Sequence, residues 1–408
     1  MRKTLAPLLL GLALATGCAQ TGGPDHAERA RDLARDLIIV DTHIDVPYRL
    51  IEAPADIAAR TATGDFDWPR ARAGGLDGAF MSIYIPAETD ARGEASVLAD
   101  TLIDNVEAIA AAQPDKFVIA TCPADVRAAA ASGRVALPLG MENGGPIAGD
   151  IARLDHYRDR GIAYVGLTHS KSNHISDSSY DSNEPWGGLS PFGRTLVPEL
   201  QARGIMVDVS HVSDRAFWQI VELAQAPIIA SHSSLRHFTP GFARNLDDAM
   251  VQAIAGTGGV VQIAFGSGFL TRPARAWGDA QRAAITTYVT AEKLTTDDPA
   301  IEAFVAGWRK DNPYPYASID DLLDHIDRAV KLAGIDHVGI GSDFDGVGDT
   351  LPVGLKDGSA FPALVEGLLR RGYSEADIEK ILGGNLLRVW STVRDYGASK
   401  AGTVACRG

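Results

Sequence analysis

Eight short apolar runs alternate with longer segments of helical spacing, and this alternation constrains the fold more than any other feature of the chain. The runs span 37–45, 78–85, 135–141, 163–168, 205–210, 227–231, 259–265 and 337–342. Amphipathic stretches lie between them, for example 214–224, 247–255 and 319–333. Apolar strands that alternate with helices are typical of a parallel sheet covered by helices. Eight such units predict an α/β chain folded as a (β/α)8 barrel of the TIM type, with a doubly wound sheet as the alternative.

Two connections are much longer than the others. The first follows the fourth run and spans 170–193, and the second follows the seventh run, spans 266–317 and contains Trp277, Trp308 and Tyr314. Connections of this length are typically lids, binding loops or disordered segments. Both leave from carboxyl ends of strands, the face on which barrel enzymes carry their sites. We therefore expect a site bordered by long βα loops.

The rest of the chain predicts a single domain. After the eighth run, segments 361–370 and 375–396 have the spacing of closing helices. We expect a linker and first helix over 18–36, one barrel over 37–396, and a C-terminal tail over 397–408.

The N-terminus has a different character. Basic residues at positions 2 and 3 precede an apolar run over 5–15, which is shorter than the ~20 residues that span a bilayer. A basic start, a short apolar stretch and small residues predict an export signal over 1–17. The break, Ala15-Thr16-Gly17-Cys18, resembles the lipobox of bacterial lipoproteins, which implies that Cys18 is lipidated. An ordinary cleaved signal is the alternative.

These features predict an exported protein. The resemblance places it as a lipoprotein of a bacterial membrane, the outer one by expectation, facing the periplasm; without the lipid it would be soluble there. No other segment is apolar enough to span a membrane, so the anchor is the one membrane contact we expect. The net charge of −14 disfavours nucleic-acid partners. Cys122 and Cys406 could pair in an oxidising periplasm or remain separate thiols.

Ionisable side chains lie at the ends of six of the eight runs or directly after them. In chain order they are His43, Asp45, Glu142, His169, His211, His232 and Asp343. The carboxyl ends of parallel strands meet at one rim of a barrel, so we expect these side chains to converge. Each alone could be a hydrogen-bonded structural residue, but together they are better explained by function. Clustered carboxylates are costly unless a cation offsets their charge.

The convergent residues suit a pair of metal sites. Asp45, Glu142 and three imidazoles, from His43, His211 and His232, supply the ligands, and Glu142 is the natural bridge because a carboxylate has two oxygens. Nitrogen and oxygen ligands without a thiolate predict two Zn²⁺, with Mn²⁺ or Co²⁺ as alternatives. Two such ions can share a water, lower its pKa and polarise a carbonyl, and the bridging hydroxide is then the nucleophile. This chemistry serves amides, esters and phosphoesters alike.

The order of motifs names a family. From about residue 41 to residue 390 the chain resembles the membrane (renal) dipeptidases, zinc dipeptidases of peptidase family M19 with an amidohydrolase-like barrel. The matching motifs are His43-Ile44-Asp45-Val46-Pro47, Gly140-Met141-Glu142-Asn143-Gly144, Leu167-Thr168-His169-Ser170, Asp208-Val209-Ser210-His211-Val212-Ser213, Ala230-Ser231-His232-Ser233-Ser234, Arg244-Asn245, Gly341-Ser342-Asp343-Phe344-Asp345-Gly346 and Gly384-Asn385-Leu386-Leu387-Arg388.

The resemblance also implies residue roles. One zinc would be held by His43, Asp45 and Glu142, and the other by Glu142, His211 and His232, which agrees with the set proposed from strand ends. His169 would hydrogen-bond the scissile carbonyl, and Arg244 would bind the free α-carboxylate of a dipeptide. Taken alone, Arg244 would be interpreted as an exposed loop charge.

Asp343 would act as general base and then general acid, whereas Asp345 is expected to be structural. The family further implies tolerance of a D-residue at the C-terminal position, and frequent homodimers. This chain departs from the family at Phe269, where a Tyr is expected, and its connection over 266–317 could reshape specificity.

Two other functions remain open. A barrel amidohydrolase acting on a lactone, cyclic amide or phosphotriester would normally begin with His-x-His and bridge its metals with a modified Lys. Here the first motif is His43-x-Asp45 and Glu142 supplies the bridge, which disfavours that class. A non-catalytic binding lipoprotein should have lost ligands, yet the full set is present.

Overall fold

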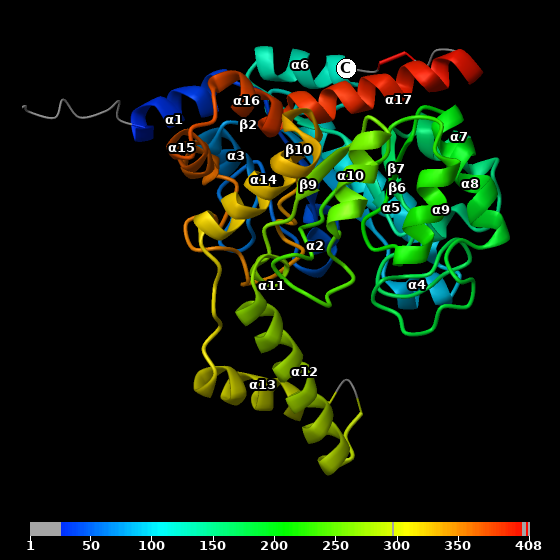
Figure 1. Cartoon of the computed structure of the whole chain (residues 1–408), viewed down its shortest axis with the longest axis vertical. Coiled ribbons are helices and arrows are strands. Elements are labelled where there is room, and N and C mark those ends of the chain that lie inside the picture. Colours follow the sequence, from blue (N-terminus) through cyan, green and yellow to red (C-terminus); the bar gives the residue numbers. More distant parts are fainter. Residues whose placement is uncertain (1–25, 296–297, 402–404, 407–408) are drawn as a thin grey trace, which may run out of the picture.

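Eight parallel strands form the central barrel. The computed structural model describes residues 26–295, 298–401 and 405–406. Every pair of neighbouring strands runs parallel, with helices outside (Figure 1). The barrel strands are β1 (Ile39–Ile44), β2 (Leu76–Tyr84), β5 (Leu139–Glu142), β6 (Ile162–Gly166), β7 (Met206–Asp208), β8 (Ile229–Ala230), β9 (Val260–Ile263) and β10 (Val338–Ile340). The predicted α/β barrel is confirmed, because each strand overlaps one of the eight predicted runs.

The sheet closes between its first and last strands. The hydrogen-bonded order runs from β10 down to β5 and then to β2, which pairs with β1. Ile44 at the end of β1 forms a parallel bridge with Phe344 beyond β10. The amide of Asp343 donates to the carbonyl of His43 at 3.1 Å. Closure therefore brings the carboxyl end of β10 beside that of β1.

The third predicted strand is interrupted. Pro138 divides the run into β4 (Val135–Leu137) and β5, because proline has no amide to donate to a sheet. β4 pairs with β3 (Phe117–Ile119), a strand that the sequence analysis did not predict. Three residues are too few to give a recognisable pattern.

The helices surround the barrel and cover one end of it. Those before the fifth strand of the barrel are α1 (His26–Asp36), α2 (Val46–Glu52), α3 (Trp68–Gly74), α4 (Ala87–Ala91), α5 (Ala95–Ala112), α6 (Pro123–Ala131), η1 (Gly145–Ile147), α7 (Arg153–Asp159) and α8 (Pro191–Ala202). The later ones are α9 (Asp214–Leu223), α10 (Asp248–Gly256), α11 (Ser267–Leu270), α12 (Arg272–Glu292), α13 (Ala300–Asp311), α14 (Ile319–Ala333), η2 (Ile335–His337), α15 (Phe361–Arg370), α16 (Glu375–Glu379), η3 (Lys380–Gly384) and α17 (Asn385–Ala401).

Local sequence explains where these helices begin and which face they bury. The Ser318 hydroxyl accepts from the Asp321 amide and forms a capping box at the start of α14. Leu322, Leu323 and Ile326 of α14 are buried, at the spacing of one helical face. α14 and α15 have the predicted bounds. The helix predicted over 375–396 is instead broken around Gly383, where a Cβ would lie 2.8 Å from the carbonyl oxygen of Ile38.

A column of aromatic rings fills the barrel below the site. Trp390 of α17 packs on Phe80 of β2 with ring centroids 5.3 Å apart, and Phe80 packs on Tyr164 of β6 at 5.6 Å. Gly140 makes room for Tyr164, because a Cβ at position 140 would lie 2.0 Å from its ring. The hydroxyl of Tyr164 points up to His43 at 2.9 Å. The core thus supports the rim of the barrel from below.

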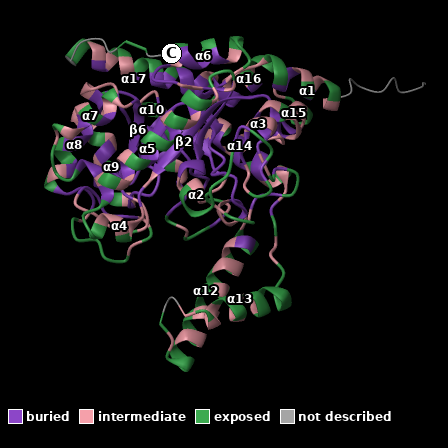
Figure 2. Ribbon diagram, turned by 180° about the vertical axis from the view of Figure 1, so that it is seen from behind, coloured by how far each residue is buried: buried purple, intermediate pink, exposed green. Residues whose placement is uncertain are grey.

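The long connection after β9 is a helical hairpin. Helices α12 and α13 project from the barrel (Figure 1), so the structure does not support a lid without secondary structure over 266–317. Exposed and half-buried residues dominate both helices, in contrast to the buried barrel (Figure 2). Trp277 packs against Trp308 at 5.0 Å and Tyr314 at 4.8 Å, between ring centroids. These aromatic contacts hold the hairpin together.

The C-terminal tail is attached to the barrel. Cys122 and Cys406 form a disulfide with a Cα–Cα distance of 5.5 Å, which resolves the alternatives left by the sequence. The predicted signal peptide and Cys18 lie outside the described residues. Among the described helices, none is long and apolar enough to cross a membrane.

Candidate metal centre

The predicted rim residues lie together at the carboxyl ends of the strands. His43 and Glu142 belong to β1 and β5, and the others lie in the first residues after their strands. Four non-glycine residues here adopt a left-handed backbone, with φ of 73°, 71°, 65° and 65° at Asn143, His211, Asp343 and Asp345. This conformation costs energy for non-glycine residues and clusters at functional sites. Tight turns at the strand ends thus direct His211, Asp343 and Asp345 into the barrel mouth.

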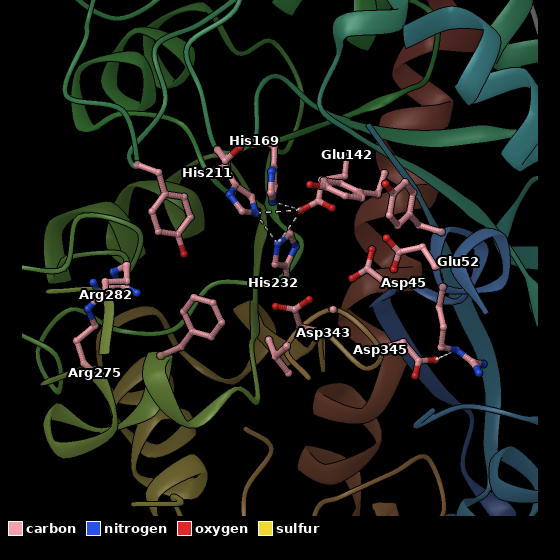
Figure 3. Close-up of a pocket in the computed structure, with 18 residues that line it drawn as sticks. Asp45, Glu52, Glu142, His169, His211, His232, Arg275, Arg282, Asp343 and Asp345 are labelled. Atoms are coloured by element: carbon pink, nitrogen blue, oxygen red, sulfur yellow. Dashed lines mark hydrogen bonds and ion pairs between the residues drawn. The ribbon is translucent and has the colours of Figure 1, made fainter. Parts of the chain in front are cut away.

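Glu142 lies at the centre of the group (Figure 3). Its Oε2 lies 3.5 Å from His43 Nε2. Its Oε1 lies 3.0 Å from His211 Nε2, 3.3 Å from His232 Nε2 and 3.8 Å from His169 Nε2. One carboxylate therefore faces imidazoles at or just after the ends of four different strands. Its Oε2 faces His43, and its Oε1 faces the other three.

Hydrogen bonds fix which nitrogen of His232 is free. The hydroxyl of Ser231 donates to Asp208 at 2.6 Å and lies 2.8 Å from His232 Nδ1. Because its hydrogen is given to the carboxylate, Ser231 accepts from Nδ1–H of His232. The other nitrogen, Nε2, is then an unprotonated acceptor that faces Glu142. This is how proteins commonly orient a metal-binding imidazole.

His211 presents a second acceptor to the same point. Arg244 Nη2 lies 3.1 Å from His211 Nε2, and a guanidinium can only donate, so Nε2 of His211 accepts. That nitrogen lies 2.9 Å from His232 Nε2. Two nitrogen lone pairs and a carboxylate oxygen therefore converge, and a cation between them would relieve their repulsion.

A parallel arrangement surrounds His43. Tyr164 donates to the carbonyl of Thr42 at 3.0 Å, so its oxygen accepts from His43 Nδ1–H. The opposite nitrogen, Nε2, lies 3.5 Å from Asp45 Oδ2 and 3.5 Å from Glu142 Oε2. Both His43 Nε2 and Asp45 Oδ1 are buried without a hydrogen-bond partner. A divalent cation bound between these two atoms would give each of them a partner.

Burial and charge set the protonation states. Burial is the main cause that lowers the pKa of His211 and His232 well below 6.5, so both imidazoles are neutral, the form that binds a metal. Burial opposes the charge of Glu142, but His43 and then His169 outweigh it and hold its pKa well below 4.5. The donor set fits a divalent cation, since imidazole nitrogens and carboxylate oxygens are its usual ligands.

Asp343 lies beside this group, but its pKa is shifted in the opposite direction from that of Glu142. One oxygen of Asp343 lies within 4.8 Å of ligand atoms of His43 and Asp45. Burial, and then the charge of Asp45, raise the pKa of Asp343 from 3.8 to about 8. Gly346 keeps this region open, because a Cβ there would lie 2.2 Å from Asp45 and 2.3 Å from Asp343. A carboxyl of this kind can hold a proton near neutral pH.

Arg244 is buried, with 3% of its surface exposed, and so is not the exposed loop charge considered above. It donates to the Ser233 hydroxyl at 2.7 Å and to the His232 carbonyl at 2.8 Å. Its Nε has no hydrogen-bond partner, and among the described residues no carboxylate pairs with it. A buried cation without a counter-charge is costly, so this position favours an anionic ligand.

A cavity of about 650 Å³ opens over the group. Six predicted site residues line it, namely Asp45, Glu142, His169, His211, His232 and Asp343, together with Asp345, which also pairs with Arg49 at 3.1 Å. The sequence analysis missed Tyr180, Arg275 and Arg282, which line the same cavity. Residues 275, 279 and 282 share one face of a helix, but that signal requires α12 to be recognised as a helix.

Fold and site together define a hydrolase-type barrel with a cation-binding mouth. A sequence profile of the membrane dipeptidases, peptidase family M19, matches residues 27–403. The chain belongs to this family of metallopeptidases, as the sequence resemblance predicted.

Solved structures agree with this assignment. The chain is 28% identical to the probable dipeptidase PvdM from Pseudomonas aeruginosa, with a TM-score of 0.77 over 91% of this chain and 99% of that one. It is 26% identical to a metallopeptidase from Rhodobacter sphaeroides, with a TM-score of 0.71 over 88% and 99%. That protein was solved with a phosphinate mimic of the dipeptide L-Ala-D-Ala. A dipeptidase of the same family is 27% identical, with a TM-score of 0.72 over 89% and 99%.

Proposed function

We propose that this protein is a binuclear zinc dipeptidase, which hydrolyses the peptide bond of dipeptides and accepts a D-residue at the C-terminal position. One observation carries the proposal. The two oxygens of Glu142 face different imidazoles: Oε2 lies 3.5 Å from His43 Nε2, and Oε1 lies 3.0 Å and 3.3 Å from Nε2 of His211 and His232. A bridging carboxylate has this arrangement.

Each zinc would have its own ligand set. His43, Asp45 and Glu142 would hold one ion, and Glu142, His211 and His232 the other, because these are the two groups of converging acceptors. When bound, such ions lower the pKa of water and polarise a carbonyl. The imidazole and carboxylate ligands suit zinc, with Mn²⁺ or Co²⁺ as the alternatives.

The chain's own residues would bind and orient the substrate. Arg244 would accept the α-carboxylate of the C-terminal residue, because its buried guanidinium lacks a counter-charge. His169 lines the cavity, with its Nε2 at 3.8 Å from Glu142 Oε1, and would donate to the carbonyl oxygen of the scissile bond. The carboxylate of Asp343 would accept a proton from the attacking water and then donate it to the leaving amine nitrogen.

This binding mode would limit the enzyme to dipeptides. In a longer peptide, the α-carboxylate lies too far from the scissile bond to reach Arg244 while His169 holds the carbonyl. Tolerance of a D-residue is supported by the L-Ala-D-Ala mimic in the Rhodobacter sphaeroides protein.

We further propose that the protein is an exported lipoprotein attached through Cys18, with its domain boundaries at 17, 36 and 396. The Cys122–Cys406 disulfide supports an oxidising compartment such as the periplasm. A homodimer is proposed from the family resemblance alone.

The test is a substrate panel with purified protein, with and without chelator. We expect two zinc equivalents by mass spectrometry, and chelator-sensitive hydrolysis of L-L and L-D dipeptides. Tripeptides, lactones and phosphotriesters should be poor substrates. Tripeptide cleavage as fast as dipeptide cleavage would contradict the role of Arg244, and faster cleavage of a lactone or phosphotriester would favour the other barrel hydrolases.

A further inference from the structure

The cavity is charged unequally at its two ends. Arg275 and Arg282 of α12 line one side, and Glu52 and Asp345 line the other (Figure 3). The side chains between these two sides are those of His169, His211, His232 and Glu142 (Figure 3). The two arginines are not needed for the cation site or for the proposed reaction, so their place in the cavity requires another explanation.

A chain of ring contacts connects these arginines to Arg244. The guanidinium of Arg244 lies over the ring of Phe269, at 5.5 Å from its centroid. Phe269 stacks on Phe242, with centroids 5.9 Å apart, and the guanidinium of Arg275 lies over Phe242 at 4.1 Å. These contacts connect the buried Arg244 with Arg275, and Phe269 and Arg275 line the cavity. Phe269 lines the cavity and contributes an apolar ring surface between the two guanidinium groups.

The arginine pair keeps a net positive charge. Asp279 pairs with both Arg275 and Arg282, and among the described residues no other carboxylate pairs with either. Two guanidinium groups and one carboxylate leave one positive charge on the cavity wall. The side chains are 25% and 59% exposed, respectively, so both can reach a ligand in the cavity.

We propose that Arg275 and Arg282 form a second anion subsite, which selects dipeptides whose C-terminal residue has a carboxylate side chain. The inference rests on the proposed function, because Arg244 must bind the α-carboxylate of that same residue. The side chain of the residue would then extend past Phe269, which lines the cavity, toward Arg275. A short acidic side chain, Asp or Glu, would meet the positive pair there.

The test compares an acid with its isosteric amide. For the wild-type protein, kcat/KM for L-Ala-D-Glu should exceed that for L-Ala-D-Gln by about tenfold or more, the range expected for charge-assisted hydrogen bonds. The double variant Arg275→Gln/Arg282→Gln should lose this preference by a fall in kcat/KM for the acid, with the amide changed by less than about threefold. Arg272→Gln is the matched control, because Arg272 is an exposed arginine of the same helix that does not line the cavity.

A binding measurement separates recognition from turnover. Phosphinate mimics of the two dipeptides, titrated into the zinc-loaded protein by calorimetry, should show the same preference for the acid, and higher ionic strength should weaken it. Equal kcat/KM for acid and amide in the wild type, or a preference that survives in the double variant, would overturn the subsite. Failure to hydrolyse any dipeptide would instead overturn the proposed function.

Discussion

The group of metal-ligand candidates and the α12–α13 hairpin border the same cavity, but they are built in opposite ways. At the barrel mouth, His43, Asp45, Glu142, His211 and His232 are each less than 8% exposed. In the hairpin, among the residues that the structure describes, Ala274 is the one buried residue of α12, and α13 has none. The first region is held by the barrel core, and the second by a few aromatic contacts of its own.

The difference in burial suits the barrel mouth to catalysis and the hairpin to substrate selection. Buried acceptors on parallel strands keep fixed positions, as a pair of cations requires. An exposed hairpin can change its surface without disturbing the core, so it is suited to selecting substrates. His325 of α14 connects the loop after β8 with α11, the helix that precedes the hairpin, because its Nδ1 accepts from the Leu235 amide and its Nε2 donates to the Leu270 carbonyl.

The substitution Glu142→Gln is expected to have the largest effect, because it tests whether the buried barrel mouth holds the metal ions. An amide cannot bridge two cations, so we expect kcat/KM to fall by at least roughly a thousandfold, together with the bound metal. Metal content and activity should be measured on the same preparation. Glu52→Gln is the control, because Glu52 is an exposed carboxylate of the same cavity, outside the ligand set. Full metal occupancy in Glu142→Gln would contradict the assigned site.

The junction between the two regions should be sensitive to acid. Burial lowers the pKa of His325 to about 4, below the usual 6.5. The folded protein thus keeps His325 neutral, whereas the unfolded chain takes up a proton as the pH falls below 6.5. The stability from this residue is complete at neutral pH and is lost between about pH 6.5 and pH 4, by about 3 kcal/mol.

Urea unfolding of the wild type and His325→Gln at several pH values measures this effect. We expect their difference in unfolding free energy to shrink as the pH falls through that window. Parallel curves for the two proteins would show that His325 does not make the junction acid-sensitive.

The variant Ser231→Ala tests how the barrel mouth orients a single metal-ligand candidate, His232. The hydroxyl of Ser231 links His232 to Asp208, and its loss leaves Nδ1 of His232 without its acceptor. Zinc affinity, measured by competition with a chelator, should weaken about 10–100-fold. Ser234→Ala is the matched control, because Ser234 is also buried but donates to the carbonyl of Ala264. An equal loss in both variants would indicate general loosening of the mouth.

The smallest effect on the whole protein is expected from Trp277→Ala in the hairpin. Trp277 packs on Trp308 and Tyr314 and donates to the carbonyl of Asn312 at 2.8 Å. Without it, amide exchange in α13 should accelerate, while the Tm of the barrel changes by less than about 2 °C. A large fall in Tm would show that the hairpin and barrel unfold as one unit.

Much of the fold could be predicted, because the signals are local. The bounds of α14 and α15 follow from caps and apolar spacing, and the alternation of strands with helices predicts the barrel. The signal fails where tertiary structure overrides local pattern. Pro138 divides a strand, β3 is too short to recognise, and Gly383 breaks a helix where the chain passes Ile38. The hairpin lies in a segment whose length suggested a loop.

The site could be predicted less completely. Seven ionisable residues near strand ends were identifiable from the sequence, because strand ends of a parallel barrel share one rim. Tyr164 could not be identified, since an aromatic residue inside a strand looks like any core residue. The free nitrogen of each imidazole also depends on partners that are distant in the sequence, such as Asp208 for His232.

By itself, the sequence determined which side chains reach the barrel mouth, because the apolar periodicity specifies strands and the strand ends carry the acids and histidines. Tertiary structure decided which atoms of those side chains face one another, and that Arg275 and Arg282 of a projecting helix join the same cavity. The physical reason is the sequence separation over which each interaction acts. Periodicity and capping act over a few residues, whereas hydrogen-bond acceptors and charges meet across strands hundreds of residues apart, and only barrel closure sets their distances.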